Sequence, residues 1–368
     1  MLTAPDQPER YSFLCAVVLC TTALAGCAEF PDAEYATERV EIATAFDARL
    51  CAGTAAKIEG WAVDASQRLG IDPLTEDPVL LVWGDAAVRE YCREGVKGCY
   101  LHEPRVVAAS YSAIAHELVH ATTSRSRDDE LNTFVEEGIA EAMTASALRR
   151  EMDPMLPSIL VSLPRGEFEV AGNRATAGHF FRYLSQTYAF AVLDELRSEL
   201  KRPVSIETAD DVFAEVLGVR LTDLEQSWLS DSPSIYTRLP DTTPDADAVL
   251  SESVALGYTL ACDDPRTEGP LAARETESGD PTSGMSSARV LDVVRAAEFE
   301  IHARTTSTAE GGVVLRSLAC WDGSLRNVVH EVAFGLPSVV ALEACRWEVL
   351  AWTPEYVGTE VEVTIERL

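Results

Sequence analysis

The sequence contains few histidines and lacks a long apolar segment, and both shortages restrict what the chain can do. Six of its 368 residues are histidine, so histidines at a fixed spacing are informative. The apolar run Phe13–Ala25 is too short to cross a bilayer as a stable helix, which needs about 20 apolar residues. The sequence also lacks a CxxC spacing, so a zinc site made of cysteines and thioredoxin-like chemistry have no support.

Basic residues are also scarce. The chain has 30 Lys and Arg against 60 Asp and Glu, which gives a formal charge of -30. Such a chain repels phosphate backbones, so we do not expect a nucleic-acid partner. The acidic charge is typical of solvated faces and says little about a substrate. A hydrophobic content of 47% and a charged content of 24% predict a folded chain, and the length suggests two domains.

The apolar run near the N-terminus has the length of a signal-peptide core. It ends in Leu24-Ala25-Gly26-Cys27, which resembles a bacterial lipobox. That resemblance implies a lipoprotein signal peptide over residues 1–26, lipidation of Cys27 and a flexible tether over 27–37. The expected location is the bacterial cell envelope, outside the cytoplasm, with a lipid anchor at Cys27 in the outer or the cytoplasmic membrane. The alternative is a buried helix followed by a chance cysteine.

Six of the nine cysteines lie after Cys27. An even number in an exported chain predicts disulfides, although the sequence does not determine their pairing. Cys92 and Cys99 flank a short glycine-containing loop, so they are the best candidate pair. The alternative is that some of the cysteines are free and buried.

Strand and helix patterns predict a mixed α/β region followed by a mostly helical one. The expected strands are Glu38–Phe46, Val79–Trp83 and Arg105–Ala109. The expected helices are Thr54–Leu69, Ser112–Thr122, Leu131–Leu148, Ala177–Tyr188, Ala191–Leu200, Ala209–Leu217 and Thr222–Leu229. The expected fold class is therefore α+β.

The pattern changes after the helical region. A polar, proline-containing stretch predicts a linker over 233–250, and Asp263–Ser287 is expected to be a long surface loop. Short alternating segments then predict strands at Phe299–Arg304, Val313–Leu318, Val328–Phe334, Trp347–Trp352 and Val361–Ile365. We therefore expect a domain over 38–232 and a β-sandwich accessory domain over 251–368.

The segment with the clearest chemistry is His116-Glu117-Leu118-Val119-His120, an HExxH motif. On a helix, His116 and His120 project from one face, so two imidazoles can bind one zinc ion. Glu117 can take a proton from a water molecule that the metal activates. The alternative is a chance match in an amphipathic helix.

A third ligand is expected from the next helix. Its segment Phe134-Val-Glu-Glu-Gly-Ile-Ala-Glu141 follows a short polar turn, so an antiparallel helix would return a carboxylate to the metal. By spacing, Glu136, Glu137 and Glu141 are all candidates. Three protein ligands leave a position open for water, as a catalytic zinc site requires.

HELVH followed by FVEEGIAEA resembles the gluzincin metallopeptidases, which combine HExxH with a downstream glutamate before glycine. Further along, AGHFFRYL, FAEVLGV and LEQSW resemble the helical tail of bacterial peptidase MA-like domains. The resemblance spans roughly Val40 to Leu229. It implies a zincin-like, thermolysin-type catalytic domain.

The resemblance also implies residue roles. Glu137 matches the third ligand, and Glu141 matches an acidic residue that orients a ligand histidine. Related domains tend to have a tyrosine where this chain has Arg174, so His179 and Tyr183 become the candidates to stabilise the oxyanion. The alternatives are a solvated Glu141, a packed or exposed His179 and a core Tyr183. In gluzincins an edge strand before the metal-binding helix pairs with the substrate, which here implies Arg105–Ala109.

The expected function is hydrolysis of peptide bonds in a peptide or protein substrate by metal-activated water, with Zn²⁺ as cofactor and Glu117 as general base. The alternative is a non-catalytic envelope lipoprotein that binds a partner through its β domain on a degenerate peptidase fold. A protease specific for one client is a further alternative. The complete set of His116, Glu117, His120 and Glu137 favours the enzyme.

Overall fold

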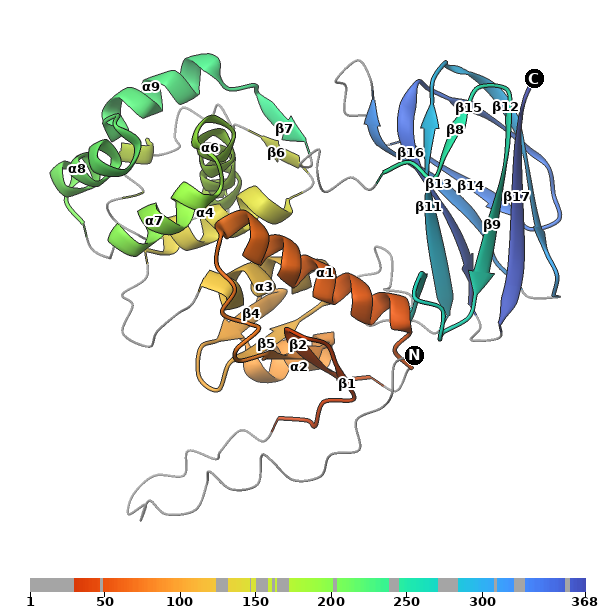
Figure 1. Cartoon of the computed structure of the whole chain (residues 1–368), viewed down its shortest axis with the longest axis horizontal. Coiled ribbons are helices and arrows are strands. Elements are labelled where there is room, and N and C mark those ends of the chain that lie inside the picture. The colour runs from red at the N-terminus through yellow and green to blue at the C-terminus, as the bar shows by residue number, and fades with distance from the viewer. Residues whose placement is uncertain are drawn as a thin grey trace, which may run out of the picture.

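The computed structural model combines helices and sheets in an N-terminal region and has a β-rich C-terminal region (Figure 1). It describes residues 30–46, 49–123, 132–145, 147–149, 158–160, 163, 172–200, 204–237, 245–270, 284–307, 310–320, 328–354 and 358–368. Over these ranges, helices with the length and apolarity needed to cross a bilayer are absent. The predicted signal peptide and Cys27 lie outside the described residues.

The N-terminal region is built on a five-stranded sheet with the order β1-β2-β3-β5-β4. The three central strands run parallel, and β1 and β4 are antiparallel to their neighbours. The strands are β1 (Tyr35–Ala36), β2 (Val40–Thr44), β3 (Val79–Trp83), β4 (Gly98–Leu101) and β5 (Val106–Ala109). Parallel strands buried on both faces are apolar along their whole length, which explains the sequence VLLVW in β3.

Helices cover both faces of this sheet. Successive residues of a strand point to opposite faces, so β5 contributes to two separate cores. Val107 and Ala109 pack with residues of α1 (Ala52–Leu69) and α3 (Ile114–Thr123). Val106 and Ala108 pack on the other face with α2 (Asp85–Tyr91). Along the chain, α3 follows β5 closely, and the short 3-10 turn η1 (Tyr111–Ala113) lies between them.

One expectation about the sheet is wrong. We expected Arg105–Ala109 to be the edge strand beside the metal-binding helix, but β5 lies inside the sheet. The edge strand is β4, which pairs antiparallel with β5 from Gly98↔Ala109 to Leu101↔Val106. β4 (GCYL) begins with glycine and is only half-buried, whereas β5 (VVAA) is a fully buried apolar run, so the sequence predicted β5 and missed its outer neighbour.

A layer of helices follows the sheet. It consists of α4 (Thr133–Thr144), α6 (Gly172–Tyr188), α7 (Ala191–Glu199), α8 (Ile206–Leu217) and α9 (Leu221–Asp231), with the small sheet of β6 (Ala147–Arg149) and β7 (Ile235–Thr237). Two glycines let α4 and α6 approach closely. A β-carbon at Gly138 would overlap the Phe181 ring, and one at Gly178 would lie 2.6 Å from Glu141 Cβ.

The C-terminal region consists of two sheets that share one buried core, as in a β-sandwich. One sheet has the order β10-β11-β16-β13-β14, with β8 beside β11, and the other has the order β15-β12-β17-β9. The strands are β8 (Ala248–Leu250), β9 (Ser253–Leu260), β10 (Thr267–Glu268), β11 (Met285–Val293), β12 (Ala297–Thr305), β13 (Gly312–Cys320), β14 (Val329–Ala333), β15 (Ser338–Leu342), β16 (Cys345–Thr353) and β17 (Thr359–Arg367).

Strands also occupy parts of the segments expected to be irregular. Tyr35–Ala36, within the expected tether, pairs with β2. Both ends of the expected linker contain strands, since β7 pairs with β6 and β8 pairs with β11. β10 and the start of β11 lie within the stretch expected to be a surface loop. Most of these pieces are two or three residues long, so their sequences carry almost no periodic signal.

The two regions are covalently joined. A disulfide links Cys51, which precedes α1, to Cys262 in the β-rich region. Beside it, Lys57 of α1 forms an ion pair of 2.7 Å with Glu268 of β10. Two further disulfides join Cys92 to Cys99 and Cys320 to Cys345. The expectation of disulfides in this chain, and of the Cys92–Cys99 pair in particular, is confirmed.

Candidate metal centre

His116 and His120 lie one turn apart on α3, and their Nε2 atoms are 3.1 Å apart. Glu137 of α4 faces them, with Oε2 3.3 Å from His116 Nε2 and Oε1 3.7 Å from His120 Nε2. Donor atoms about 2.0–2.1 Å from a tetrahedral zinc ion lie about 3.3–3.4 Å from one another. The spacing of these three side chains therefore fits a single metal ion.

Glu137 is the candidate ligand whose surroundings best fit a cation. Its Oε2 atom is buried and makes no hydrogen bond, although His116 Nε2 lies 3.3 Å and Arg174 Nε 3.4 Å from it. A buried oxygen without a hydrogen bond costs free energy, and a metal ion at this position would remove that cost. The cluster of His116, His120 and Glu137 can thus bind a metal.

The other ring nitrogen of each histidine also faces a carboxylate. Glu141 Oε1 lies 3.8 Å from Nδ1 of His116, and Glu136 Oε2 lies 4.0 Å from Nδ1 of His120. Carboxylates beside metal-binding imidazoles help to orient them, and here both lie beyond hydrogen-bond length from the rings. The resemblance implies such a role for Glu141. Glu136, a candidate ligand by spacing, lies instead beside the outer nitrogen of His120.

Glu136 belongs to a buried ion-pair network. Arg197 of α7 lies 3.1 Å from its Oε1 and 3.2 Å from Asp194, and Thr123 donates to Oε2. The side chains of Arg197 and Glu136 are 5% and 7% exposed. This network connects Asp194 and Arg197 of α7, through Glu136, to the ring of His120.

Glu117 follows the first histidine and is buried. Burial raises the pKa of its carboxyl group, and the nearby His120 and His116 act in the opposite direction. Its neighbour across the site is Gly98 of the edge strand β4, where a β-carbon would lie 2.9 Å from Glu117 Cγ. A carboxylate with a raised pKa beside a metal is suited to accept and return a proton.

The metal-free cluster is strongly polarised. Burial acts to lower the pKa of His120, but Glu136, Glu117 and Glu137 outweigh it and raise the value to about 9. Burial acts to raise the pKa of Glu137, yet His116 and His120 hold it at about 2. The charged ring of His120 and the charged carboxylate of Glu137 therefore attract each other across the site.

His179 and Tyr183 lie away from the cluster. His179 is fully buried, its Nδ1 accepts a hydrogen bond of 2.9 Å from Trp228 Nε1, and its Nε2 donates to the carbonyl of Pro233. Tyr183 packs against the helical core. These contacts favour the packing role that was weighed for both residues. The residue in the sequence that could have indicated a packing role for His179 is Trp228, because a buried indole N–H needs a hydrogen-bond acceptor.

Arg174, at the start of α6, extends towards the ligands. Its Nε lies 3.4 Å from Glu137 Oε2, and its side chain is 47% exposed. From the sequence, position 174 differs from the tyrosine of related domains, but the sequence does not indicate a contact between Arg174 and the candidate ligands. The structure brings the guanidinium group to the solvent side of the cluster.

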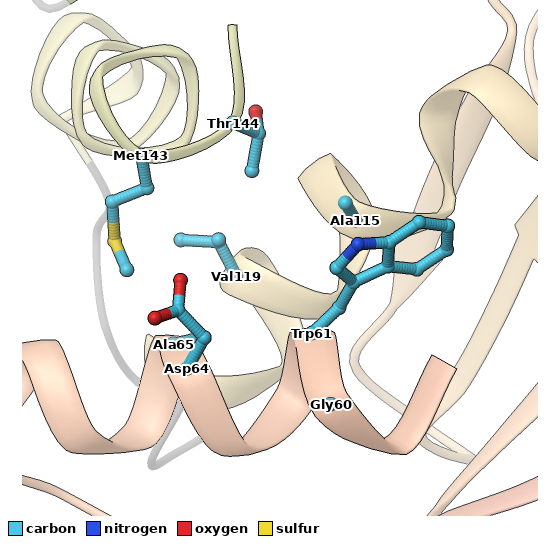
Figure 2. Close-up of a pocket in the computed structure, with 8 residues that line it drawn as sticks. All are labelled: Gly60, Trp61, Asp64, Ala65, Ala115, Val119, Met143 and Thr144. Carbon is cyan, nitrogen blue, oxygen red and sulfur yellow. The ribbon is translucent and has the colours of Figure 1, made fainter. Parts of the chain in front are cut away.

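A pocket of about 250 Å³ lies between α1, α3 and α4, next to the cluster (Figure 2). Ala115 and Val119 in its wall precede the two histidines, and Trp61 and Met143 supply the larger apolar surfaces. Asp64 also lines it, but its carboxylate is paired with Arg68 at 2.8 Å. The pocket thus has a mixed polar and apolar lining and lies against the positions that precede both histidines.

A second group of metal-binding side chains lies in the β-rich region, where Cys320, Glu343 and Cys345 come together. The two cysteines form a disulfide, so their sulfur atoms are not available as thiolate ligands.

Neither the protein-family models nor the curated proteins contain a match to this chain. Three solved structures illustrate its similarities. The pre-peptidase C-terminal domain of a Bacillus anthracis collagenase is 8% identical over 34% of this chain and 99% of that chain, with a TM-score of 0.22. A Podospora anserina β-(1,4)-mannanase is 14% identical over 31% and 28%, with a TM-score of 0.17. A Clostridium thermocellum endo-1,4-β-D-xylanase is 14% identical over 32% and 26%, with a TM-score of 0.16. Similarities at this level define neither the fold nor the activity of this chain.

Proposed function

We propose that this protein is a zinc-dependent peptidase of the gluzincin type, with a zincin-like catalytic region carrying the metal centre. The observation that carries the proposal is the convergence of His116, His120 and Glu137 from two helices, with the Oε2 atom of Glu137 buried and without a hydrogen bond. Three protein ligands leave one tetrahedral position open, which is the arrangement of catalytic rather than structural zinc.

The arrangement of sheet and helices supports the same proposal. The helix with both histidines follows a strand of a mixed sheet, and the next helix supplies the carboxylate. An exposed sheet edge offers backbone groups to an extended peptide. We propose that β4, with Gly98 beside Glu117, is the edge along which the substrate lies.

Each group of residues at the site has its own role in the proposed hydrolysis. Zn²⁺ held by His116, His120 and Glu137 would polarise a peptide carbonyl and lower the pKa of a water molecule. Glu117 accepts the proton of the attacking water and passes it to the leaving amine. Glu141 and Glu136 hold the imidazole rings in the orientation that presents Nε2 to the ion.

We further propose that the protein is anchored to the bacterial cell envelope by a lipid on Cys27. The support is the sequence Leu24-Ala25-Gly26-Cys27 after a short apolar run. The three disulfides support an oxidising compartment.

The test begins with the chain from residue 28 onwards, purified without a tag that binds metal. We expect about one zinc per chain by elemental analysis, and its loss in His120→Ala. Hydrolysis of unstructured proteins such as casein is then compared between the wild type and Glu117→Gln. We expect Glu117→Gln to keep the zinc and to lose activity by roughly 100-fold or more.

The two measurements separate the possible outcomes. A wild-type chain without zinc, even after supplementation, would overturn the metal site and leave an envelope binding protein on a degenerate peptidase fold. A chain that binds zinc but cleaves no protein, including envelope extracts, would retain the site and reject the peptidase.

A further inference from the structure

The candidate metal centre has an unequal distribution of charge. Four carboxylates surround the two histidines, namely those of Glu117, Glu136, Glu137 and Glu141. On the inner side, Arg197 is buried against Glu136. On the solvent side, Arg174 lies beside Glu137 with almost half of its side chain exposed. Arg174 can therefore contact a molecule that enters from solvent, whereas the buried Arg197 cannot.

The position of Arg174 is not explained by stability or by metal binding. The side chain of Arg174 is 47% exposed against 15% for Glu137, and at 3.4 Å, without a hydrogen bond to Oε2, such a pair contributes little to folding. A guanidinium 3.4 Å from a ligand oxygen competes with a divalent cation for that oxygen and repels it. Because arginine keeps its charge at any relevant pH, the repulsion persists when the metal binds. A residue that weakens the metal site needs another role.

When Glu137 binds the metal, its oxygens no longer need the guanidinium as a partner. Arg174, at the start of α6 and partly exposed, would then have its N–H donors free to bind an oxygen of the substrate. Planar N–H donors on a charged group bind oxyanions strongly and with defined geometry. The negative charge of the neighbouring carboxylates repels free anions from the site. The positive charge of Arg174 can therefore act only on an oxygen that a bound substrate brings within hydrogen-bond length.

We propose that Arg174 is a catalytic residue that donates hydrogen bonds to the oxyanion formed during hydrolysis, an inference that rests on the proposed function. Water oxygen forms a bond to the carbonyl carbon, the C=O π pair moves to oxygen and Glu117 takes the proton. The electron pair on the oxyanion then re-forms the C=O bond as the C–N bond breaks, and Glu117 returns the proton to the amine nitrogen. Arg174 stabilises the negative oxygen while the tetrahedral intermediate exists and neither gains nor loses a proton.

The experiment uses zinc alone, methylphosphonate as a tetrahedral oxyanion, and imidazole as an uncharged ligand for zinc. Zinc affinity is measured by competition with a chelator in the wild type, Arg174→Gln and Arg174→Lys. The affinities of the zinc-loaded proteins for both probes are then measured by calorimetry. Arg220→Gln is the matched control, because Arg220 is also an exposed helix-end arginine near a carboxylate, Asp210.

We expect Arg174→Gln to bind zinc about two- to five-fold more tightly, because a competing charge is removed. It should bind methylphosphonate at least about 10-fold more weakly and imidazole unchanged, with Arg174→Lys between it and the wild type. Arg220→Gln should match the wild type. Equal methylphosphonate affinity in zinc-loaded wild type and Arg174→Gln would overturn the inference alone. A wild type that binds no zinc would overturn the proposed function and the inference together.

Discussion

Gly98 of the edge strand lies directly against Glu117 of the metal-binding helix. An ideal β-carbon at position 98 would be 2.9 Å from Glu117 Cγ and 3.1 Å from its Oε1. The Cys92–Cys99 disulfide holds the next residue of the strand. The absence of a side chain at Gly98 thus determines where the carboxylate of the candidate general base can lie, because any larger residue would displace it.

The first prediction is that Gly98→Ala lowers peptide hydrolysis while leaving zinc bound. The new methyl group would shift Glu117 by several tenths of an ångström, and small misplacements of a reacting group cost about 10- to 100-fold in rate. Gly257→Ala is the control, because a β-carbon there has open space. Zinc content and hydrolysis of a protein substrate are measured for both variants. Full activity in Gly98→Ala would show that Glu117 tolerates the methyl group.

The second prediction concerns the buried pair of Arg197 and Glu136. Arg197→Met leaves the buried carboxylate of Glu136 with His120 as its remaining cationic neighbour. Breaking a buried ion pair in this way typically costs up to about 3–5 kcal/mol in unfolding free energy. Adding Glu136→Gln should recover part of this loss, because it removes the uncompensated charge. Arg220→Met removes an arginine that is 67% exposed and should cost less than about 1 kcal/mol. Urea unfolding of the metal-free proteins measures all three, and equal losses in both single variants would contradict the assignment.

The sequence predicted those parts of the site that depend on local spacing. His116 and His120 share a face because they are four residues apart, and an i, i+4 pattern is visible without a structure. Spacing alone left Glu136, Glu137 and Glu141 open, since the choice depends on how α4 packs on α3. The contacts of Arg174 were invisible because a single exposed arginine on a helix carries no pattern.

The same distinction applies to the fold. Strand β3 has the predicted bounds Val79–Trp83, because a buried parallel strand is a continuous apolar run between polar turns. Strand β4 was missed because its half-buried sequence GCYL, which begins with glycine, is not a continuous apolar run like that of β5, and its register is set by pairing with β5. The partner of Cys51 could not be predicted, because the disulfide joins positions separated by 211 residues.

The third prediction is that the metal-free protein loses stability between pH 6.5 and pH 9. The pKa of His120 is raised from 6.5 to about 9, so the folded state holds this proton more tightly than the unfolded chain. The resulting stabilisation is complete below pH 6.5 and is lost as the pH rises through 9, by about 3 kcal/mol. Urea unfolding in the presence of a chelator measures the loss. His120→Gln should remove most of this pH dependence, and an unchanged dependence would assign it to other groups.

The fourth prediction concerns the disulfide between Cys51 and Cys262, which spans 211 residues, whereas Cys92–Cys99 spans seven. Loop-closure entropy gives about 5 kcal/mol for the longer loop and about 2 kcal/mol for the shorter one. Replacing Cys51 and Cys262 by serine should therefore lower the unfolding free energy more than replacing Cys92 and Cys99.

The hydrogen bonds at this junction limit how far the two regions can separate in that variant. Thr54 Oγ1 still bonds to Gly269, and Lys57 still pairs with Glu268. We therefore expect the native contact to persist in the absence of denaturant, with zinc content unchanged. In denaturant the β-rich region should unfold in a separate transition, because only non-covalent contacts then join it to α1. A single transition with unchanged midpoint in the double-serine variant would mean that these contacts alone couple the two regions.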